Sequence, residues 1–225
     1  NPQRDDVMAA LEGENQIAKL LCGENDCIAI DGVPEGVRAE ISELFGFAFG
    51  LLTDFSVRDT HYSVIYEAAP EKLCPFCGIE TFDAPTAPRE PLDHYLAKSR
   101  YPFAAANLRN LVPMGPKCNT NYKLAKDLLR REDGTRRVAF DPYVKSAVEI
   151  SLDDSEPFGG STENTPRWEV SFKPDSPCST TWDEIFLLKL RYRRDRLDPS
   201  FRSWLDLFAK SARRKGVQSE AALID

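Results

Sequence analysis

Long apolar runs are missing from this sequence of 225 residues, and only two histidines are present. The apolar stretch at 45–52 is interrupted by Gly46 and Gly50, and it falls well short of the ~20 residues that a membrane span needs. The first six residues are polar and lack the apolar core of a secretory signal. These absences predict a cytoplasmic protein without a membrane partner.

A surplus of positive charge is also missing, since the formal net charge is -7. The charges are unevenly distributed: residues 1–60 carry four basic side chains against twelve acidic ones, whereas residues 186–215 carry ten basic against three acidic. Phosphate binding depends on a local basic field, so the second segment is predicted to hold a nucleic-acid backbone. The alternative is that it docks on the acidic N-terminal part. The side chains predicted to contact nucleic acid are Lys98, Arg100, Arg191, Arg193, Arg194, Arg213, Arg214 and Lys215.

Hydrophobic spacing predicts a mostly helical N-terminal third and a mixed remainder. A proline-rich loop is expected at 83–91 and a turn at Asp133-Gly134. Thr181 is expected to cap the helix that follows it. The predicted helices cover 5–21, 34–52, 57–68, 119–131, 182–196 and a last helix that begins at Asp198 or Ser200 and ends at 214. The predicted strands cover 137–140 and 168–172.

The six cysteines include one Cys-x-x-Cys pair, formed by Cys74 and Cys77. In an intracellular protein this spacing is more often a metal or redox site than a disulfide. Cys118 adds a third sulfur, but the position that would complete a second pair is Gly115. Structural zinc usually has four Cys or His ligands. Either the fourth ligand comes from elsewhere in the chain, or the cysteines form a packed thiol cluster.

One of the two histidines, His94, directly follows Asp93. A neutral imidazole can take a proton from water near pH 7, because its ordinary pKa is about 6.5. A neighbouring carboxylate can hold a divalent cation that neutralises a phosphodiester oxygen. Asn110 and Asn119 follow, and an amide oxygen suits such a hard cation. This combination is typical of a small metal-dependent nuclease.

The order of these motifs between 73 and 131 resembles the HNH endonucleases, whose core is the ββα-metal fold. The shared order is Cys-x-x-Cys, Asp-His, Asn-Leu, Cys-Asn and then Lys. Asn107 also precedes a leucine, but the Val-Pro that follows Asn110-Leu111 favours Asn110 for this position. The resemblance implies an α+β protein with an HNH core embedded between N-terminal and C-terminal helical extensions. The departure at Gly115 bears on the structural zinc and not on the catalytic ion.

The resemblance also implies a role for each matching residue. His94 would be the general base that activates water, and Asn110 would orient its imidazole by holding the loop between the strands. Asp93 and Asn119 would bind a catalytic Mg²⁺ or Mn²⁺ ion. Because Asn119 stands where the family often has histidine, the motif is an H-N-N variant. Lys123 would face the phosphate.

The expected domains are a helical scaffold over 1–70, the nuclease core over 71–145 and a mixed extension with basic helices over 146–225. The expected function is metal-dependent hydrolysis of DNA. HNH proteins with such extensions resemble effectors of bacterial anti-phage defence, which implies an ATPase partner. The alternative function is a non-catalytic, zinc-knuckle-like module that binds nucleic acid or protein. A redox role for the cysteine pair would require a helix that starts at its first cysteine.

Overall fold

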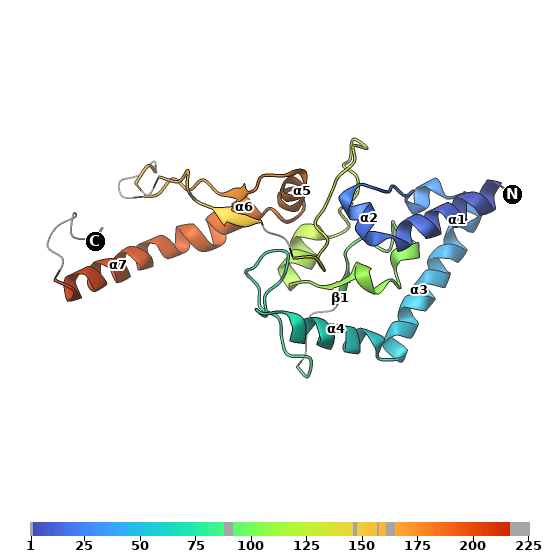
Figure 1. Cartoon of the computed structure of the whole chain (residues 1–225), viewed down its shortest axis with the longest axis horizontal. Coiled ribbons are helices and arrows are strands. Elements are labelled where there is room, and N and C mark those ends of the chain that lie inside the picture. The colour runs from blue at the N-terminus through green and yellow to red at the C-terminus, as the bar shows by residue number, and fades with distance from the viewer. Residues whose placement is uncertain (1, 88–91, 146–147, 157, 161–164, 217–225) are drawn as a thin grey trace. The chain divides into compact units, whose positions relative to one another are not determined.

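The computed structural model describes residues 2–87, 92–145, 148–156, 158–160 and 165–216 (Figure 1). The chain divides into two compact units, the first comprising Asn1–Ala147 with Asp175–Leu187 and the second Val148–Pro174 with Leu188–Asp225. The combination of helices with two small antiparallel sheets confirms the predicted α+β class. The helices of the described residues are all too short or too polar to cross a membrane.

The N-terminal part of the first unit is helical, as predicted. Its helices are α1 (Pro2–Asn15), α2 (Ile17–Cys22), α3 (Arg38–Asp54) and α4 (Val57–Ala68). The bounds of α4 agree with the prediction, but the single helix expected over 5–21 is divided at Gln16, whose φ of -97° and ψ of 55° are not helical. Two 3₁₀ turns, Ile30–Gly32 and Glu35–Val37, precede α3, so this helix begins later than residue 34.

A short hairpin lies at the centre of the first unit. Strand β1 (Leu92–His94) pairs antiparallel with β2 (Leu111–Pro113), and His94 stands opposite Leu111. Two 3₁₀ turns, Pro102–Ala104 and Leu108–Asn110, lie in the connection between the strands. Buried Tyr62 of α4 packs with Leu92 and Leu111, so the helical scaffold fixes the hairpin from its apolar side. A second cluster fixes the connection, and it comprises Ala10, Val33, Ile41 and Phe103.

The helix predicted over 119–131 is wrong. The chain after β2 forms a π-helical turn, Cys118–Lys123, which ends because Leu124 adopts a φ of 49°. The strand predicted over 137–140 is also wrong. Arg136 makes a single β-bridge with Arg130, and the amide of Ala139 donates to the Leu21 carbonyl at the end of α2 instead of to a neighbouring strand.

The C-terminal helices begin and end at different residues from those predicted, with one exception. Helix α5 (Pro177–Phe186) is capped by Ser176 in a reciprocal capping box, and Thr181 is a buried residue within it. A φ of 51° at Leu187 ends this helix, so the continuous helix predicted over 182–196 does not form.

The second unit contains the remaining helices and a hairpin. Helix α6 (Leu188–Tyr192) and a π-helical turn (Arg193–Leu197) lead into α7 (Asp198–Arg214), which begins at the first of its two predicted starts and ends where predicted. Strand β3 (Glu149–Ser151) pairs with β4 (Ser171–Lys173), so the strand predicted over 168–172 is shifted towards the C-terminus. The loop predicted at 83–91 lies partly outside the described residues.

Candidate functional site

His94 is buried at the end of β1 and has a defined tautomer. Its Nε2 atom lies 2.9 Å from the carbonyl oxygen of Ala105. Because a carbonyl can only accept a hydrogen bond, Nε2 carries the proton, and Nδ1 of the neutral ring is the proton acceptor. The ring also packs on Phe49 of α3, with 4.5 Å between the ring centroids. The side chain is therefore fixed in an orientation that leaves the basic nitrogen on the opposite edge of the ring.

The pKa of His94 is lowered to about 4, first because burial disfavours the charged imidazolium. The carboxylate of Asp93 raises this pKa, while the ammonium groups of Lys98 and Lys123 lower it. All three charged side chains therefore act on the imidazole. At neutral pH His94 is an uncharged base.

Asp93 and Lys123 form an ion pair beside this histidine. The Nζ atom of Lys123 lies 2.8 Å from Oδ2 of Asp93, and the lysine side chain is buried. Lys123 and Asn119 belong to the same helical turn, four positions apart, and side chains at this spacing share a helix face. The structure therefore brings the Asp-His pair together with the turn that carries Asn119.

Asn110 holds the loop between the two strands, as its sequence position suggested. Its Oδ1 atom accepts a 2.7 Å hydrogen bond from the amide of Leu96, and Nδ2 donates to the carbonyls of Leu96 at 3.0 Å and Ala104 at 3.1 Å. The side chain is fully buried. The rival Asn107 instead caps the short turn that follows it, by accepting from the amide of Arg109. Orientation of the imidazole by Asn110 stays a prediction.

Glu14 is a functional candidate that sequence reasoning missed. This residue of α1 is completely buried, and its Oε2 atom accepts a 3.2 Å hydrogen bond from the amide of Ala104. Burial raises its pKa to about 8, against the lowering effect of the hydrogen bonds from the backbone of Ala104 and Phe103. The turn that supplies the Ala105 carbonyl to His94 is therefore held from α1. A lone glutamate in an amphipathic helix gives no sequence signal for this contact.

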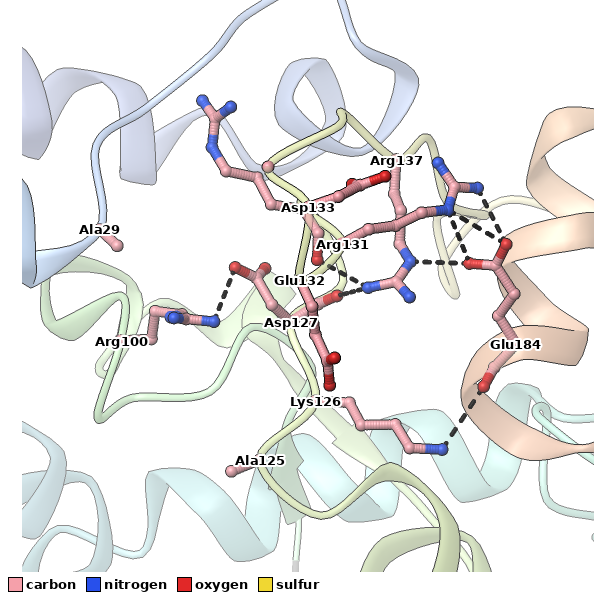
Figure 2. A pocket seen from close by; sticks show the side chains of 12 residues that line it. Ala29, Arg100, Ala125, Lys126, Asp127, Arg131, Glu132, Asp133, Arg137 and Glu184 are labelled. Carbon is pink, nitrogen blue, oxygen red and sulfur yellow. Dashed lines mark hydrogen bonds and ion pairs between the residues drawn. The ribbon is translucent and has the colours of Figure 1, made fainter.

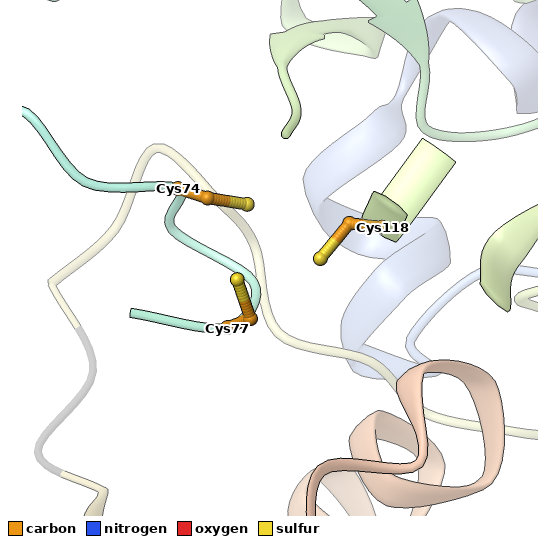
Figure 3. A group of neighbouring side chains, drawn as sticks. All are labelled: Cys74, Cys77 and Cys118. Carbon is orange, nitrogen blue, oxygen red and sulfur yellow. The ribbon is translucent and has the colours of Figure 1, made fainter. Parts of the chain in front are cut away.

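The three predicted zinc ligands converge (Figure 3). The sulfur atoms of Cys74, Cys77 and Cys118 all lie within 4.8 Å of one another, and all three residues are buried, so they are close enough to bind one metal ion. Hydrogen bonds from the Cys118 and Cys74 thiols lower the pKa of Cys77, whereas burial raises that of Cys74. We call these three residues the cysteine triad.

The backbone around the cysteine triad has the form of a knuckle. Residues 74–78 form a tight turn in which the amide of Gly78 donates to the Cys74 carbonyl at 2.9 Å, and Gly78 has a φ of 59°. The amide of Gly115 donates to the Cys74 sulfur at 3.3 Å. Because no helix starts at Cys74 within this described turn, the requirement for a redox role is not met.

A cavity of about 980 Å³ lies elsewhere in the first unit, and its basic side chains are bound by carboxylates or backbone carbonyls of the chain (Figure 2). Arg131 and Arg137 both bond the carboxylate of Glu184. The Lys126 ammonium donates to the carbonyl of Ile185 at 3.0 Å. Arg100, a predicted nucleic-acid contact, lies on the wall and pairs with Asp127 at 3.1 Å. The cavity is thus lined by a structural ion-pair network.

The predicted basic contacts differ in accessibility. Lys98 is exposed, with its ammonium 5.2 Å from the centre of the Phe49 ring. In the second unit Arg191 is buried, which removes it from the side chains that can reach a phosphate in this structure. Arg194 is exposed and pairs with its neighbour Asp195. The remaining exposed residues of the predicted set are Arg193, Arg213, Arg214 and Lys215.

Comparison with protein-family models, curated proteins and solved structures finds no match to this chain. Its function is therefore inferred from its own side chains. Two groups in the first unit offer chemistry: the histidine centre, which we define as Asp93, His94, Asn119 and Lys123, and the cysteine triad.

Proposed function

We propose that the chain hydrolyses phosphodiester bonds of DNA at the histidine centre. The observation that supports this most is the state of His94: a buried, uncharged imidazole whose Nε2 proton is engaged by the Ala105 carbonyl. His61 makes a similar hydrogen bond to a backbone carbonyl, but His94 also lies beside a carboxylate and a buried lysine. A general base needs this arrangement, because its acceptor nitrogen must be unprotonated and correctly aimed.

In the proposed reaction, Nδ1 of His94 takes a proton from a water molecule as the water oxygen attacks phosphorus. The bond from phosphorus to the leaving oxygen breaks, and that oxygen is then protonated by solvent. The resulting imidazolium is made less unfavourable by the adjacent Asp93 carboxylate, which raises the pKa of His94. The Ala105 carbonyl keeps the ring from rotating during the transfer.

Asp93 and Asn119 would hold a magnesium or manganese ion, which when bound supplies positive charge to the leaving oxygen. The donor set fits such an ion, since both side chains offer oxygen. Among the described residues, the buried Oδ2 atom of Asp93 has an ion pair with Lys123 but no well-aligned hydrogen bond. An oxygen in this state is suited to a cation. Lys123 would add a second positive charge on the phosphate side.

We further propose that the cysteine triad holds a structural zinc ion. Soft thiolate ligands select zinc, and the three buried sulfurs are correctly grouped for it. The ion would join the knuckle at 74–78 to the start of the turn that carries Asn119 and Lys123. Bacterial anti-phage defence, with an ATPase partner, is the setting that the HNH resemblance implies for this activity.

The test is cleavage of a supercoiled plasmid with Mg²⁺, Mn²⁺ or EDTA, using His94→Gln and the matched His61→Gln. Glutamine can still donate to a backbone carbonyl in both places, because His61 Nε2 also faces one, that of Leu111 at 3.2 Å. Loss of a general base costs about 10²- to 10⁴-fold in rate. We expect that loss for His94→Gln alone, and His94→Ala should behave in the same way.

Cleavage by His94→Gln at the wild-type rate would disprove the assignment, as would wild-type cleavage that persists in EDTA. Wild-type protein that binds DNA and never cuts it would favour the non-catalytic zinc-knuckle module instead.

A further inference from the structure

Glu80 occupies the space where a fourth zinc ligand is expected. The position three residues before Cys118 is Gly115, and a Cβ atom added there would lie 2.6 Å from Oε2 of Glu80 and 2.7 Å from its Cδ. Real Cβ atoms do not approach other atoms this closely. The glutamate side chain therefore takes the room that a cysteine at 115 would need.

The backbone holds Glu80 in this place. Its carbonyl accepts a 2.7 Å hydrogen bond from the amide of Cys74, which closes the knuckle, and the neighbouring Thr81 forms a β-bridge with Leu73. The position of Glu80 opposite the cysteine pair is thus fixed by main-chain contacts and not by its own side chain.

The carboxylate of Glu80 faces both segments that supply the cysteine triad, namely the knuckle at 74–78 and the turn that begins at Cys118. Its Oε1 atom accepts from the amide of Lys117 at 3.0 Å, and Oε2 accepts from the amide of Cys118 at 3.3 Å. Oε2 also lies 3.7 Å from the Cys77 sulfur. Around a tetrahedral zinc ion, Zn–S and Zn–O bonds of about 2.3 and 2.1 Å place sulfur and oxygen about 3.6 Å apart.

We propose that Glu80 is the fourth ligand of a Cys₃Glu zinc site, which rests on the proposal of a structural zinc ion but not on the nuclease activity. Three buried thiols lie beside a carboxylate, and a bound cation would displace the thiol protons and balance the negative charge of the resulting thiolates and of Glu80. The carboxylate lies beyond 4.8 Å from at least one of the sulfurs, so coordination requires a swing of its Oε2 atom towards the triad.

The competing role for Glu80 is that of a cap, which only satisfies the amides of Lys117 and Cys118. Glu80→Gln introduces a poor zinc ligand but keeps one of the two acceptor oxygens, and urea unfolding of the zinc-free protein measures separately what the loss of the other cap hydrogen bond costs. Glu71→Gln is the matched control, since Glu71 is an exposed glutamate outside the knuckle. Zinc per chain is measured by elemental analysis of the full-length protein, and zinc affinity by competition with a chromophoric chelator.

We expect one zinc ion per wild-type chain, a loss of affinity of at least tenfold in Glu80→Gln, and no change in Glu71→Gln. Equal affinity of wild-type and Glu80→Gln would show that Glu80 is a cap and overturn this inference, while the structural zinc proposal would stand. Wild-type protein that binds neither zinc nor Co²⁺ would overturn both. None of these readouts involves DNA cleavage, so the nuclease proposal is tested separately.

A double variant tests the same inference by restoring affinity. Glu80→Ala removes the side chain that blocks position 115, and Gly115→Cys then completes a second Cys-x-x-Cys pair. The double variant should regain wild-type zinc affinity, and its Co²⁺ form should show a stronger sulfur-to-cobalt charge-transfer band because a fourth thiolate is added. Gly115→Cys alone should bind zinc more weakly than the double variant. A double variant no better than Glu80→Ala would contradict the placement of Glu80 at the fourth position.

Discussion

The histidine centre and the cysteine triad share the turn Cys118–Lys123, but their buried polar groups are organised differently. Around His94 the protein supplies its own partners: the Ala105 carbonyl for Nε2, and the Asn110 amide for the loop that carries that carbonyl. The cysteine triad instead gathers sulfur ligands and, beside them, the carboxylate of Glu80. The histidine is thus oriented by a backbone hydrogen bond and by packing on Phe49, whereas the triad gathers three sulfurs close enough to bind one metal ion.

The largest loss of stability is expected when a cysteine of the triad is replaced. Cys74→Ser should remove bound zinc and lower the free energy of unfolding by about 3–5 kcal/mol, because a structural zinc site contributes directly to folding. Elemental analysis and urea unfolding measure the two effects. Cys22→Ser is the control, since Cys22 is an exposed thiol. Protein without zinc, together with an unchanged stability of Cys74→Ser, would leave the packed thiol cluster as the correct description.

Asn110→Ala removes the side-chain hydrogen bonds that hold the loop beside His94. This change leaves the Leu96 amide and two backbone carbonyls without their partner, and each buried unsatisfied group costs about 1–3 kcal/mol. We expect a loss of about 2–4 kcal/mol in the free energy of unfolding, with the zinc content unchanged. Asn107→Ala should cost only about 1 kcal/mol, because it removes one capping interaction with Arg109 and one hydrogen bond to the Asn15 carbonyl, both of them exposed. Equal losses in the two variants would mean that the wrong asparagine was assigned to the loop.

Helices with regular hydrophobic spacing are predicted well from the sequence, whereas the positions at which a predicted helix is interrupted are not. The sequence predicts α4 with its bounds and α7 with its end, and the candidate residues at 93–94, 110 and 118–123 do surround one hairpin. The two long helices predicted at 119–131 and 182–196 do not form because Leu124 and Leu187 adopt positive φ values. Leucine rarely takes this conformation, and both side chains are exposed, so neither residue type nor hydrophobic spacing predicts these interruptions.

The same reasoning explains which site residues the sequence does not reveal. Glu14 lies about 90 positions from the amide that it binds, since the hydrogen bond joins residue 14 to residue 104. Glu80 binds the amides of Lys117 and Cys118, which lie 37 and 38 positions further along the chain. Contacts between residues so far apart in the sequence depend on the fold and cannot be predicted from motif spacing. The Cys-x-x-Cys and Asp-His motifs can be recognised because their residues lie within a few positions of one another.

Glu14 accepts a hydrogen bond from the turn that carries the Ala105 carbonyl, and burial raises its pKa. Its contribution to stability should therefore depend on pH and not on zinc. Its pKa is about 8 in the folded chain and near 4.5 when exposed, so between these values the folded state holds a proton that the unfolded state releases. Stability that is complete below about pH 4.5 is therefore lost as the pH rises to 8, with a slope of up to about 1.4 kcal/mol per pH unit between these values. Glu14→Gln should remove this slope.

Urea unfolding at several pH values measures the effect, and Glu12→Gln, an exposed neighbour in α1, should keep the wild-type slope. A Glu14→Gln protein with an unaltered pH dependence would show that Glu14 is ionised in the folded chain.

The smallest effect on stability is expected when the basic residues at the end of α7 are replaced. None of the side chains of this fully described helix is buried, and Arg213, Arg214 and Lys215 are exposed. Replacing all three by alanine should change the free energy of unfolding by less than about 0.5 kcal/mol. If they bind phosphates, the slope of log affinity against log salt for duplex DNA should become shallower by up to about 2.7, or roughly 0.9 for each phosphate that is no longer neutralised.

Binding to all DNA sequences should weaken alike, and saturating DNA should restore much of the cleavage rate, because the histidine centre is untouched. Lys145→Ala, which removes an exposed lysine of the first unit, should leave the slope unchanged. The rival hypothesis, in which the basic segment docks on the acidic N-terminal part, predicts the reverse pattern: a lower Tm in the triple variant and an unchanged salt slope. Measuring both quantities on the same protein decides between them, because phosphate binding acts on the salt slope and internal docking acts on stability.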